Sequence, residues 1–349
     1  EKTLRDAGVV SGNIFGMTAT EAAFSHGDAW LDAMLDYVAE GYAIFREEME
    51  ARLPGAVLTP LEATYLGWLD LRAWGLTTAQ LKWIALVLMV LDHIHYFFEF
   101  TGAVPLLFSQ LGRLSAGLFL FCLIEGFIHT HDRRRYFLRI YLVSVGMGAV
   151  QFCCILFDFC RRPDGFYPMN QMLATFAVLL PMLQGVDWLR QKRWLRGLAA
   201  LVLPFAWPFF MLMVIYPMFP QAEGWLTLLG FTVLPMHTMI MDGGTLFILC
   251  GLLMYLCRLK STKLEALAFA AFYLLVYGST AVLYPGATWD FIFNQAFEWM
   301  GAFSAVFMLL YNGQRGASGR GGKYFFYVFY PAHVYVLYGL SWLLYLWMQ

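Results

Sequence analysis

Apolar residues run in long stretches from about residue 80 onward, whereas the first 73 residues are polar and acidic. Windows of about 20 apolar residues, the length that crosses a bilayer as a helix, predict nine spans. They are expected at 80–101, 105–129, 136–157, 171–189, 196–218, 243–257, 264–284, 291–311 and 324–347. The pattern predicts an all-α polytopic membrane protein with a short amino-terminal α/β fragment.

The stretch 224–241 is also apolar, but it contains Pro235 and His237. Counting it as a crossing would place the last two basic clusters outside, contrary to the positive-inside tendency, so we interpret it as re-entrant or interfacial. With nine spans and the amino end inside, the cytoplasmic side collects Arg133, Arg134, Arg135 and Arg139; Arg190, Lys192, Arg193 and Arg196; Arg258, Lys260 and Lys263; and Arg315, Arg320 and Lys323. We expect a multi-pass protein of a bacterial cytoplasmic membrane, inner or sole.

The composition is that of an integral membrane protein, since 60% of the residues are apolar, 18% are aromatic and only 13% are charged. A net charge of -1 argues against a nucleic-acid partner. The six cysteines lack the spacing of metal ligands, and no metal site is expected.

The amino-terminal part predicts a helix at Gly27–Leu53, with apolar residues spaced as one buried helix face, followed by the strand-like runs AVLT and ATYLGWLDL. Its sequence over residues 12–74, including GNIFGMTATEAAFSHGDAWLDAML and LTPLEATYLGWLDLR, resembles an internal stretch of the MalY and PatB type of pyridoxal-phosphate C–S lyases, of aminotransferase fold. That resemblance implies a partial domain at 1–76, ahead of a membrane domain at 77–349.

The resemblance does not extend to the cofactor site. In that lyase family the Schiff-base lysine lies upstream of this stretch, and here the only lysine before the membrane is Lys2, outside any Ser-Lys motif. We expect no pyridoxal phosphate and no lyase activity. The fragment is interpreted as a remnant or fusion junction, with a docking module as the alternative.

Ionisable residues lie deep inside three of the predicted spans. His93 comes eight residues before Thr101 and Arg113 eight residues after Pro105, which places both at one depth at about 1.5 Å per residue. His333 approaches the same layer from the other side, beyond Pro331. Charges in a bilayer are costly and usually mark a site. The alternative is structural: a histidine can bond a neighbouring helix, and Arg113 can pair with Asp92.

These residues belong to motifs that resemble a known family. The stretches LKWIALVLMVLDHIHYFF, the GR pair in QLGRLSAGLFLFCLIEGF, RRRYFLRIYLV, YNGQRG and KYFFYVFYPAHVYVLY are similar to the TraX family of membrane acetyltransferases, named for amino-terminal acetylation of conjugative pilin. The resemblance covers residues 78–349. Lys82 followed by His93 after ten residues also resembles the signature of the broader acyltransferase-3 superfamily.

The resemblance implies acetyl-CoA as donor and an envelope amine or hydroxyl as acceptor. His93 can serve as general base. Asp92 would orient His93 or instead pair with Arg113, and Arg113 could stabilise charge on the carbonyl oxygen. His333 would bind the acceptor or relay a proton.

Other residues are expected at the two ends of this path. Arg135, Arg139 and Lys82 would bind the donor at the cytoplasmic rim, although Lys82 can also be an interfacial anchor. Asn170 and Asp242 fall where the family often has polar residues near the substrate, although they can also be a helix cap and a turn.

Two other functional classes remain open. Buried acids such as Glu125 and Glu298, together with the histidines, would also suit a proton-coupled transporter. A non-enzymatic membrane component that recruits a partner through its amino-terminal fragment is the third possibility. The identity of the acceptor does not follow from the sequence.

Overall fold

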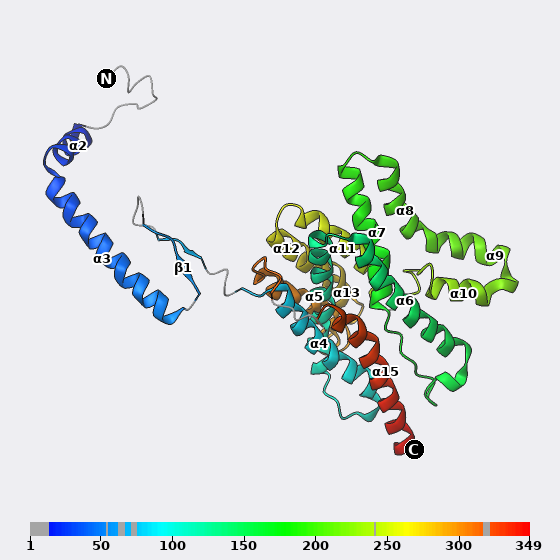
Figure 1. The fold of residues 1–349 in the computed structure, drawn as a ribbon. Helices are drawn as coiled ribbons and strands as arrows, with labels where there is room; N and C mark the ends of the chain where they lie inside the picture. The colour runs from blue at the N-terminus through cyan, green and yellow to red at the C-terminus, as the bar shows by residue number, and fades with distance from the viewer. Residues whose placement is uncertain (1–13, 54, 62–66, 71–74, 241, 317–321) are drawn as a thin grey trace. The chain divides into compact units, whose positions relative to one another are not determined.

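The computed structural model describes residues 14–53, 55–61, 67–70, 75–240, 242–316 and 322–349. The chain divides into two compact units, Glu1–Gly75 (unit 1) and Leu76–Gln349 (unit 2). Figure 1 shows a few elements in unit 1 and a bundle of helices in unit 2.

Unit 1 contains little sheet. Its described elements are α2 (Ile14–His26), α3 (Asp28–Arg52), β1 (Val57–Leu58) and β2 (Leu69–Asp70). The two strands pair antiparallel, and the Tyr42 hydroxyl of α3 donates to the Thr59 carbonyl at 2.8 Å. Of the strand-like runs, only these residues pair within the described part, while 62–66 and 71–74 lie outside it. The expected α/β fragment is therefore not confirmed.

The apolar face of α3 is exposed, which corrects the prediction of a buried helix face. No residue of α3 is fully buried, and Trp30, Leu35 and Phe45 are 70%, 52% and 46% exposed. The apolar spacing is present, but the described part of unit 1 has no second layer to cover it. A stretch this short cannot form an ordinary core alone.

Unit 2 is helical. Its elements are α4 (Thr78–Phe98), η2 (Glu99–Thr101), α5 (Leu107–His129), α6 (Arg133–Leu156), η3 (Asp158–Cys160), α7 (Met172–Arg190), α8 (Trp194–Phe210), η4 (Met211–Ile215), α9 (Tyr216–Met218), η5 (Pro220–Ala222), α10 (Glu223–Phe231), α11 (Gly244–Arg258), α12 (Thr262–Tyr273), η6 (Leu274–Gly278), α13 (Ser279–Leu283), η7 (Phe291–Gln295), η8 (Phe297–Phe303), α14 (Ser304–Leu309) and α15 (Gly322–Met348). A chain with this many long apolar helices is a multi-pass membrane protein.

The expected count of nine spans is not confirmed. Within the described residues, six helices are long and apolar enough to cross a membrane: Thr78–Thr101, Leu107–His129, Arg133–Leu156, Met172–Arg190, Trp194–Met218 and Thr262–Leu283. The spans expected at 243–257 and 291–311 correspond to shorter elements. The first is a helix of 15 residues that follows a turn with positive φ at Gly243 and Gly244, and the second changes from π to 3₁₀ to α geometry. The last expected span coincides with α15, an apolar helix of 27 residues.

The apolar stretch 224–241 does not form a crossing helix. Its helix α10 has nine residues, about 14 Å at 1.5 Å per residue, against a hydrocarbon core of about 30 Å. After α10 the chain turns, and the buried His237 bonds the Thr245 hydroxyl at 2.8 Å and the Phe205 carbonyl at 2.9 Å. These two bonds hold the segment against α8 and α11.

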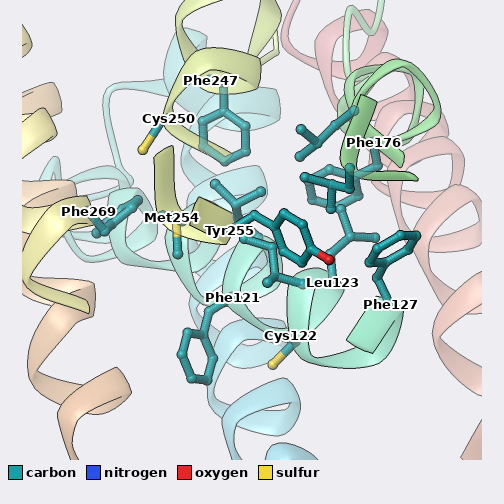
Figure 2. Packing of buried hydrophobic residues seen from close by; sticks show 14 of the residues in the cluster. Phe121, Cys122, Leu123, Phe127, Phe176, Phe247, Cys250, Met254, Tyr255 and Phe269 are labelled. Carbon is teal, nitrogen blue, oxygen red and sulfur yellow. The ribbon is translucent and has the colours of Figure 1, made fainter. Parts of the chain in front are cut away.

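The core of unit 2 lies around α5 and α7, which are the most buried of the six long helices. Figure 2 shows Tyr255 and Phe247 of α11 packed among side chains of α5 and α7, including Leu123, Phe127 and Phe176. In a membrane this packing comes from close contact rather than from exclusion of water. Leu81 and Ala85 of α4 belong to the same cluster, so α4 packs against this core.

The start of α4 is tied to the segment before α15. The Leu76 amide donates to the Leu310 carbonyl at 2.7 Å, and the Asn312 amide donates back to the Leu76 carbonyl at 3.0 Å. Thr77 and Gln80 form a reciprocal capping box on the first turn. The YNGQRG motif thus fixes the amino end of the helix that carries Asp92 and His93.

Candidate active site

Two histidines from distant parts of the sequence meet inside unit 2. His93 of α4 and His333 of α15 place Nδ1 and Nε2 only 2.6 Å apart, with their rings stacked at a centroid distance of 4.8 Å. Both side chains are buried, with 4% and 8% exposure. The Nδ1 atom of His333 lies 2.9 Å from the Phe329 carbonyl of its own helix.

The partners of these rings determine which nitrogen carries each proton in the neutral pair. A carbonyl oxygen only accepts, so Nδ1 of His333 donates to Phe329 and its Nε2 is an acceptor. Nδ1 of His93 then donates to His333, which leaves Nε2 of His93 with a free lone pair. That lone pair accepts a hydrogen bond from the Asn170 side-chain amide at 3.0 Å. The basic nitrogen of the pair is therefore Nε2 of His93.

Asn170 lies in the loop between η3 and α7. Its Oδ1 atom is buried and has no hydrogen-bond partner among the described residues. A buried acceptor without a partner costs free energy unless a ligand or water supplies a donor. The side chain thus presents one used donor and one unused acceptor beside Nε2 of His93.

The buried Arg162 anchors the loop that carries Asn170. Its guanidinium donates to the Phe97 carbonyl of α4 at 3.2 Å and to the Ser341 hydroxyl of α15 at 3.4 Å. It also pairs with Asp164 at 2.7 Å, and hydrogen bonding from Arg162 lowers the pKa of this carboxyl in the loop. The loop is therefore fastened to the same two helices that supply the histidines.

Asp92, the residue before His93 in the sequence, belongs to an ion-pair network. The Arg113 guanidinium of α5 donates to Asp92 of α4 at 2.5 Å and to Glu298 of η8 at 2.7 Å. The Ser109 hydroxyl donates to the same Asp92 oxygen at 2.9 Å. Asp92 thus takes the second of its two expected roles, pairing with Arg113; no hydrogen bond joins it to His93 in the described structure.

The glycine of the GR pair allows this network to form. A Cβ atom added at Gly112 would lie 2.3 Å from the Asp92 Cβ and 2.7 Å from its Cγ. Any larger residue would push α4 away from α5. Gly112 and Arg113 therefore act together: one provides the space for Asp92 and the other provides its counter-charge.

The remaining predicted residues have the following surroundings. The Asp242 carbonyl accepts from Thr175 at 3.0 Å, and the glycines that follow turn the chain into α11. Lys82 lies with Nζ 5.9 Å from the centre of the Phe326 ring. Arg135 is exposed and pairs with Asp132 at 3.0 Å, whereas Arg139, one turn along α6, is partly buried.

Three buried acids of unit 2 have arginine partners that the sequence did not reveal. Arg258 of α11 binds both oxygens of Glu125, and it lies 3.5 Å from Glu265 of α12. Arg133 donates to Asp187 at 2.6 Å, so it is a structural residue rather than a free member of its basic cluster. Among the described residues, no group of three or more His, Cys, Asp or Glu side chains is arranged to hold a metal ion.

Sequence reasoning missed the contacts of Ser109 and Glu298 with the network. Ser109 precedes Arg113 by four residues, so the helical period places both on one face of α5. That spacing was the available signal. For Glu298 there was no such signal, because it lies on a different helix from Arg113 and helical periodicity does not relate the two positions.

Comparison with curated proteins finds two different groups of relatives. A stretch of this chain is similar to cystathionine beta-lyase PatB of Bacillus subtilis (strain 168), at 37% identity over 70 residues, or 20% of this chain and 18% of the relative. Protein MalY of Escherichia coli (strain K12) is 35% identical over 65 residues, or 19% of this chain and 17% of the relative. The chain therefore spans less than a fifth of the length of these relatives.

The larger part of the chain matches a different group. The probable fimbrial assembly protein FimC, serogroup H1, of Dichelobacter nodosus is 27% identical over 265 residues, covering 74% of this chain and 93% of that protein. No solved structure matches. The family model described as TraX protein matches residues 77–341, which is most of the chain. The chain belongs to the TraX family.

Proposed function

We propose that this protein transfers an acetyl group from cytoplasmic acetyl-CoA to an amine or hydroxyl of an envelope acceptor, such as a pilin amino terminus or a glycan. The observation that carries the proposal is the hydrogen-bonded chain from Asn170 through His93 and His333 to the Phe329 carbonyl. It presents one buried basic nitrogen beside an unused acceptor atom. Membership of the TraX family and the similarity to a fimbrial assembly protein favour a pilin-related acceptor.

In the proposed reaction, the Asn170 amide gives up its hydrogen bond to Nε2 of His93. This nitrogen then takes the proton from the attacking N–H or O–H group. The lone pair of that nitrogen or oxygen forms a bond to the thioester carbonyl carbon, and the C–S bond then breaks. The departing CoA thiolate receives the proton from Nε2, so no net proton is gained or lost. A general base of this kind contributes about 10²–10⁴-fold to a rate.

His333 is a positioning residue in this proposal. Its bond to the Phe329 carbonyl fixes its tautomer, and its Nε2 holds Nδ1 of His93 at 2.6 Å. The imidazolium formed when Nε2 of His93 accepts a proton keeps its Nδ1 hydrogen bond. The pair therefore stays aligned through the proton transfer.

Arg113 has a supporting role in the proposal. Its guanidinium is bound to Asp92 and Glu298 and neutralises these two carboxylates. It is therefore already occupied when the carbonyl group of the donor enters the site. We assign to the Asp92–Arg113 pair the alignment of α4 against α5. Stabilisation of the oxyanion by Arg113 would require one of its two carboxylate bonds to open.

The donor is proposed to enter at the cytoplasmic rim. Arg139 and Arg135 of α6, with Lys82 of α4, would bind the phosphates of CoA, for which arginine has suitable paired donors. The acetyl group would then extend toward His93, and the acceptor would arrive from the opposite side. Asn170 would offer Oδ1 to an N–H or O–H of the acceptor, with Asp242 near the same entrance.

The test uses the purified full chain in detergent with radiolabelled acetyl-CoA and a synthetic peptide that carries a free amino terminus of pilin type. We expect His93→Gln, which preserves volume, to lose at least about 10²-fold in acetyl transfer. The matched control is His95→Ala, on the same helix two residues away, which should stay within about twofold. Transfer by His93→Gln at the wild-type rate would refute the proposal.

A separate measurement distinguishes an enzyme from the transporter and the non-enzymatic component. Calorimetry of CoA binding to the purified protein should show saturable binding that weakens in Arg139→Ala. A protein that binds no CoA but carries protons across liposome membranes would support the transporter instead. Mass spectrometry of envelope material from cells with and without the chain would identify the acetylated acceptor.

A further inference from the structure

A shallow groove runs along the outside of unit 2 between α7 and α8. It has a volume of about 340 Å³, and its lining residues are Trp188, Arg196, Ala199, Ala200, Leu203 and Pro204. All of these except Arg196 are apolar. No residue of the histidine site or of its ion-pair network takes part, so the groove is separate from the proposed reaction.

The lining of the groove forms one continuous stripe on α8. Residues 196, 199, 200, 203 and 204 recur at helical spacing, so Arg196 stands at the head of an apolar face. Eight residues separate Arg196 from Pro204, which is about 12 Å along the helix. One leaflet of hydrocarbon is about 15 Å deep, half of the usual core. The stripe therefore has nearly the length of one leaflet.

Small residues produce the hollow. Near the turn, α7 and α8 approach closely, since a Cβ atom at Gly197 would lie 2.9 Å from the Gly185 carbonyl oxygen. Beyond this contact, Ala199 and Ala200 leave room that larger side chains would fill. α8 is otherwise mostly uncovered, with only 11% of its apolar window buried inside the protein. The hollow thus faces the surrounding lipid.

The head of the groove carries uncompensated positive charge. Lys192, Arg193 and Arg196 are exposed, and within the described residues no Asp or Glu lies within ion-pair distance of them. Asp187, in the last turn of α7, is already bound by Arg133 at 2.6 Å and by the Tyr255 hydroxyl at 2.7 Å. This charge is complementary to an anionic headgroup.

We propose that this groove is a binding site for one anionic phospholipid. The phosphate would lie against Arg196, with Arg193 and Lys192 beside it, and an acyl chain would follow the stripe from Ala199 to Pro204. Trp188 would lie at headgroup level, where tryptophan is enriched in membrane proteins. Both the charge and the depth of the groove match this ligand, whereas a zwitterionic lipid would gain less from the three cations.

The experiment is native mass spectrometry of the purified full chain in detergent, titrated with phosphatidylglycerol or with phosphatidylcholine. We expect one phosphatidylglycerol to bind at least about tenfold more tightly than phosphatidylcholine. Arg196→Ala should weaken phosphatidylglycerol binding about fivefold, the effect of one interfacial cation. Ala200→Phe, which fills the hollow without changing charge, should lose retention of both lipids.

The matched control is Lys260→Ala, in the turn between α11 and α12, which removes an exposed cation that is not among the residues lining this groove. It should bind phosphatidylglycerol as the wild type does. Equal weakening by Lys260→Ala and Arg196→Ala would overturn the proposal, because the charge effect would then be general. Full retention by both Arg196→Ala and Ala200→Phe would overturn it as well. A second copy of the chain occupying this face, seen as a lipid-free dimer that Ala200→Phe abolishes, would also do so.

Discussion

The Asp92–Arg113 pair allows the sharpest quantitative test of how α4 and α5 are held together. Truncating Arg113 to alanine leaves the Asp92 carboxylate, 19% exposed, with only the Ser109 hydroxyl as a partner. At an effective dielectric constant of about 20, unit charges about 4 Å apart attract by about 4 kcal/mol. Allowing for partial access to solvent, we expect Arg113→Ala to cost about 3 kcal/mol.

The second partner of Arg113 provides the internal comparison. Glu298 is 52% exposed, so its bond to Arg113 is screened by solvent and should contribute less than about 1 kcal/mol. Glu298→Gln is therefore expected to change stability little. Asp92→Ala removes the buried carboxylate, and the double variant Asp92→Ala/Arg113→Ala removes both charges together.

The assay is thermal unfolding of each purified variant in the same detergent. A cost of 1 kcal/mol corresponds to about 2–4 °C for a domain of this size class, so Arg113→Ala should unfold about 6–12 °C below the wild type. The double variant should lose clearly less than the sum of its single variants, by about 1–3 kcal/mol. If the losses are additive, or if Glu298→Gln costs as much as Arg113→Ala, the reasoning about this pair is wrong.

Three further predictions concern packing, the site and the loop. Gly112→Ala should cost about 1–3 kcal/mol in thermal unfolding because its Cβ meets Asp92, whereas Gly146→Ala, with nothing within 4 Å, should cost nothing. Asn170→Leu should lower acetyl transfer at least about tenfold without changing the unfolding temperature by more than about 2 °C; an unchanged rate would remove Asn170 from the site. Because Arg162 lowers the pKa of Asp164, their pairing should stabilise the loop above the ordinary pKa of an aspartate, about 4, and be lost as pH falls through the lower folded value. Hydrogen exchange of the loop should therefore rise on acidification in the wild type but not in Asp164→Asn, and a flat wild-type profile would contradict this.

Part of the site follows from counting along helices. Equal depth put His93 and Arg113 in one layer, and counting from the other side brought His333 toward it, because rise per residue is nearly constant in a helix. The structure brings His93 and His333 into contact and joins Arg113 to the neighbouring Asp92. Depth alone does not give the rotation of a helix about its axis. For that reason the sequence did not decide whether Asp92 bonds to His93 or to Arg113.

Other features depend on information that no local pattern contains. Asn170 contacts His93 from a loop that Arg162 fastens to α4 and α15, and these are tertiary contacts between distant segments. The number of spans is not confirmed, because hydropathy does not distinguish an α-helix from the π and 3₁₀ geometry at 291–303. The apolar face of α3 was expected to be buried because its spacing is typical of a helix face that packs against another element. The spacing does not indicate whether such an element is present.

The pairing of residues 76–79 with 310–316 bears on how the membrane domain tolerates a different sequence in front of it. The hydrogen bonds that cap and clamp the first turn of α4 all come from residue 76 onward, so deleting or exchanging the preceding sequence removes none of them. The junction at Gly75 therefore falls where an insertion or a fusion leaves the first transmembrane helix anchored. A junction at this position allows the preceding segment to be gained, lost or replaced while the start of α4 stays anchored in the membrane domain.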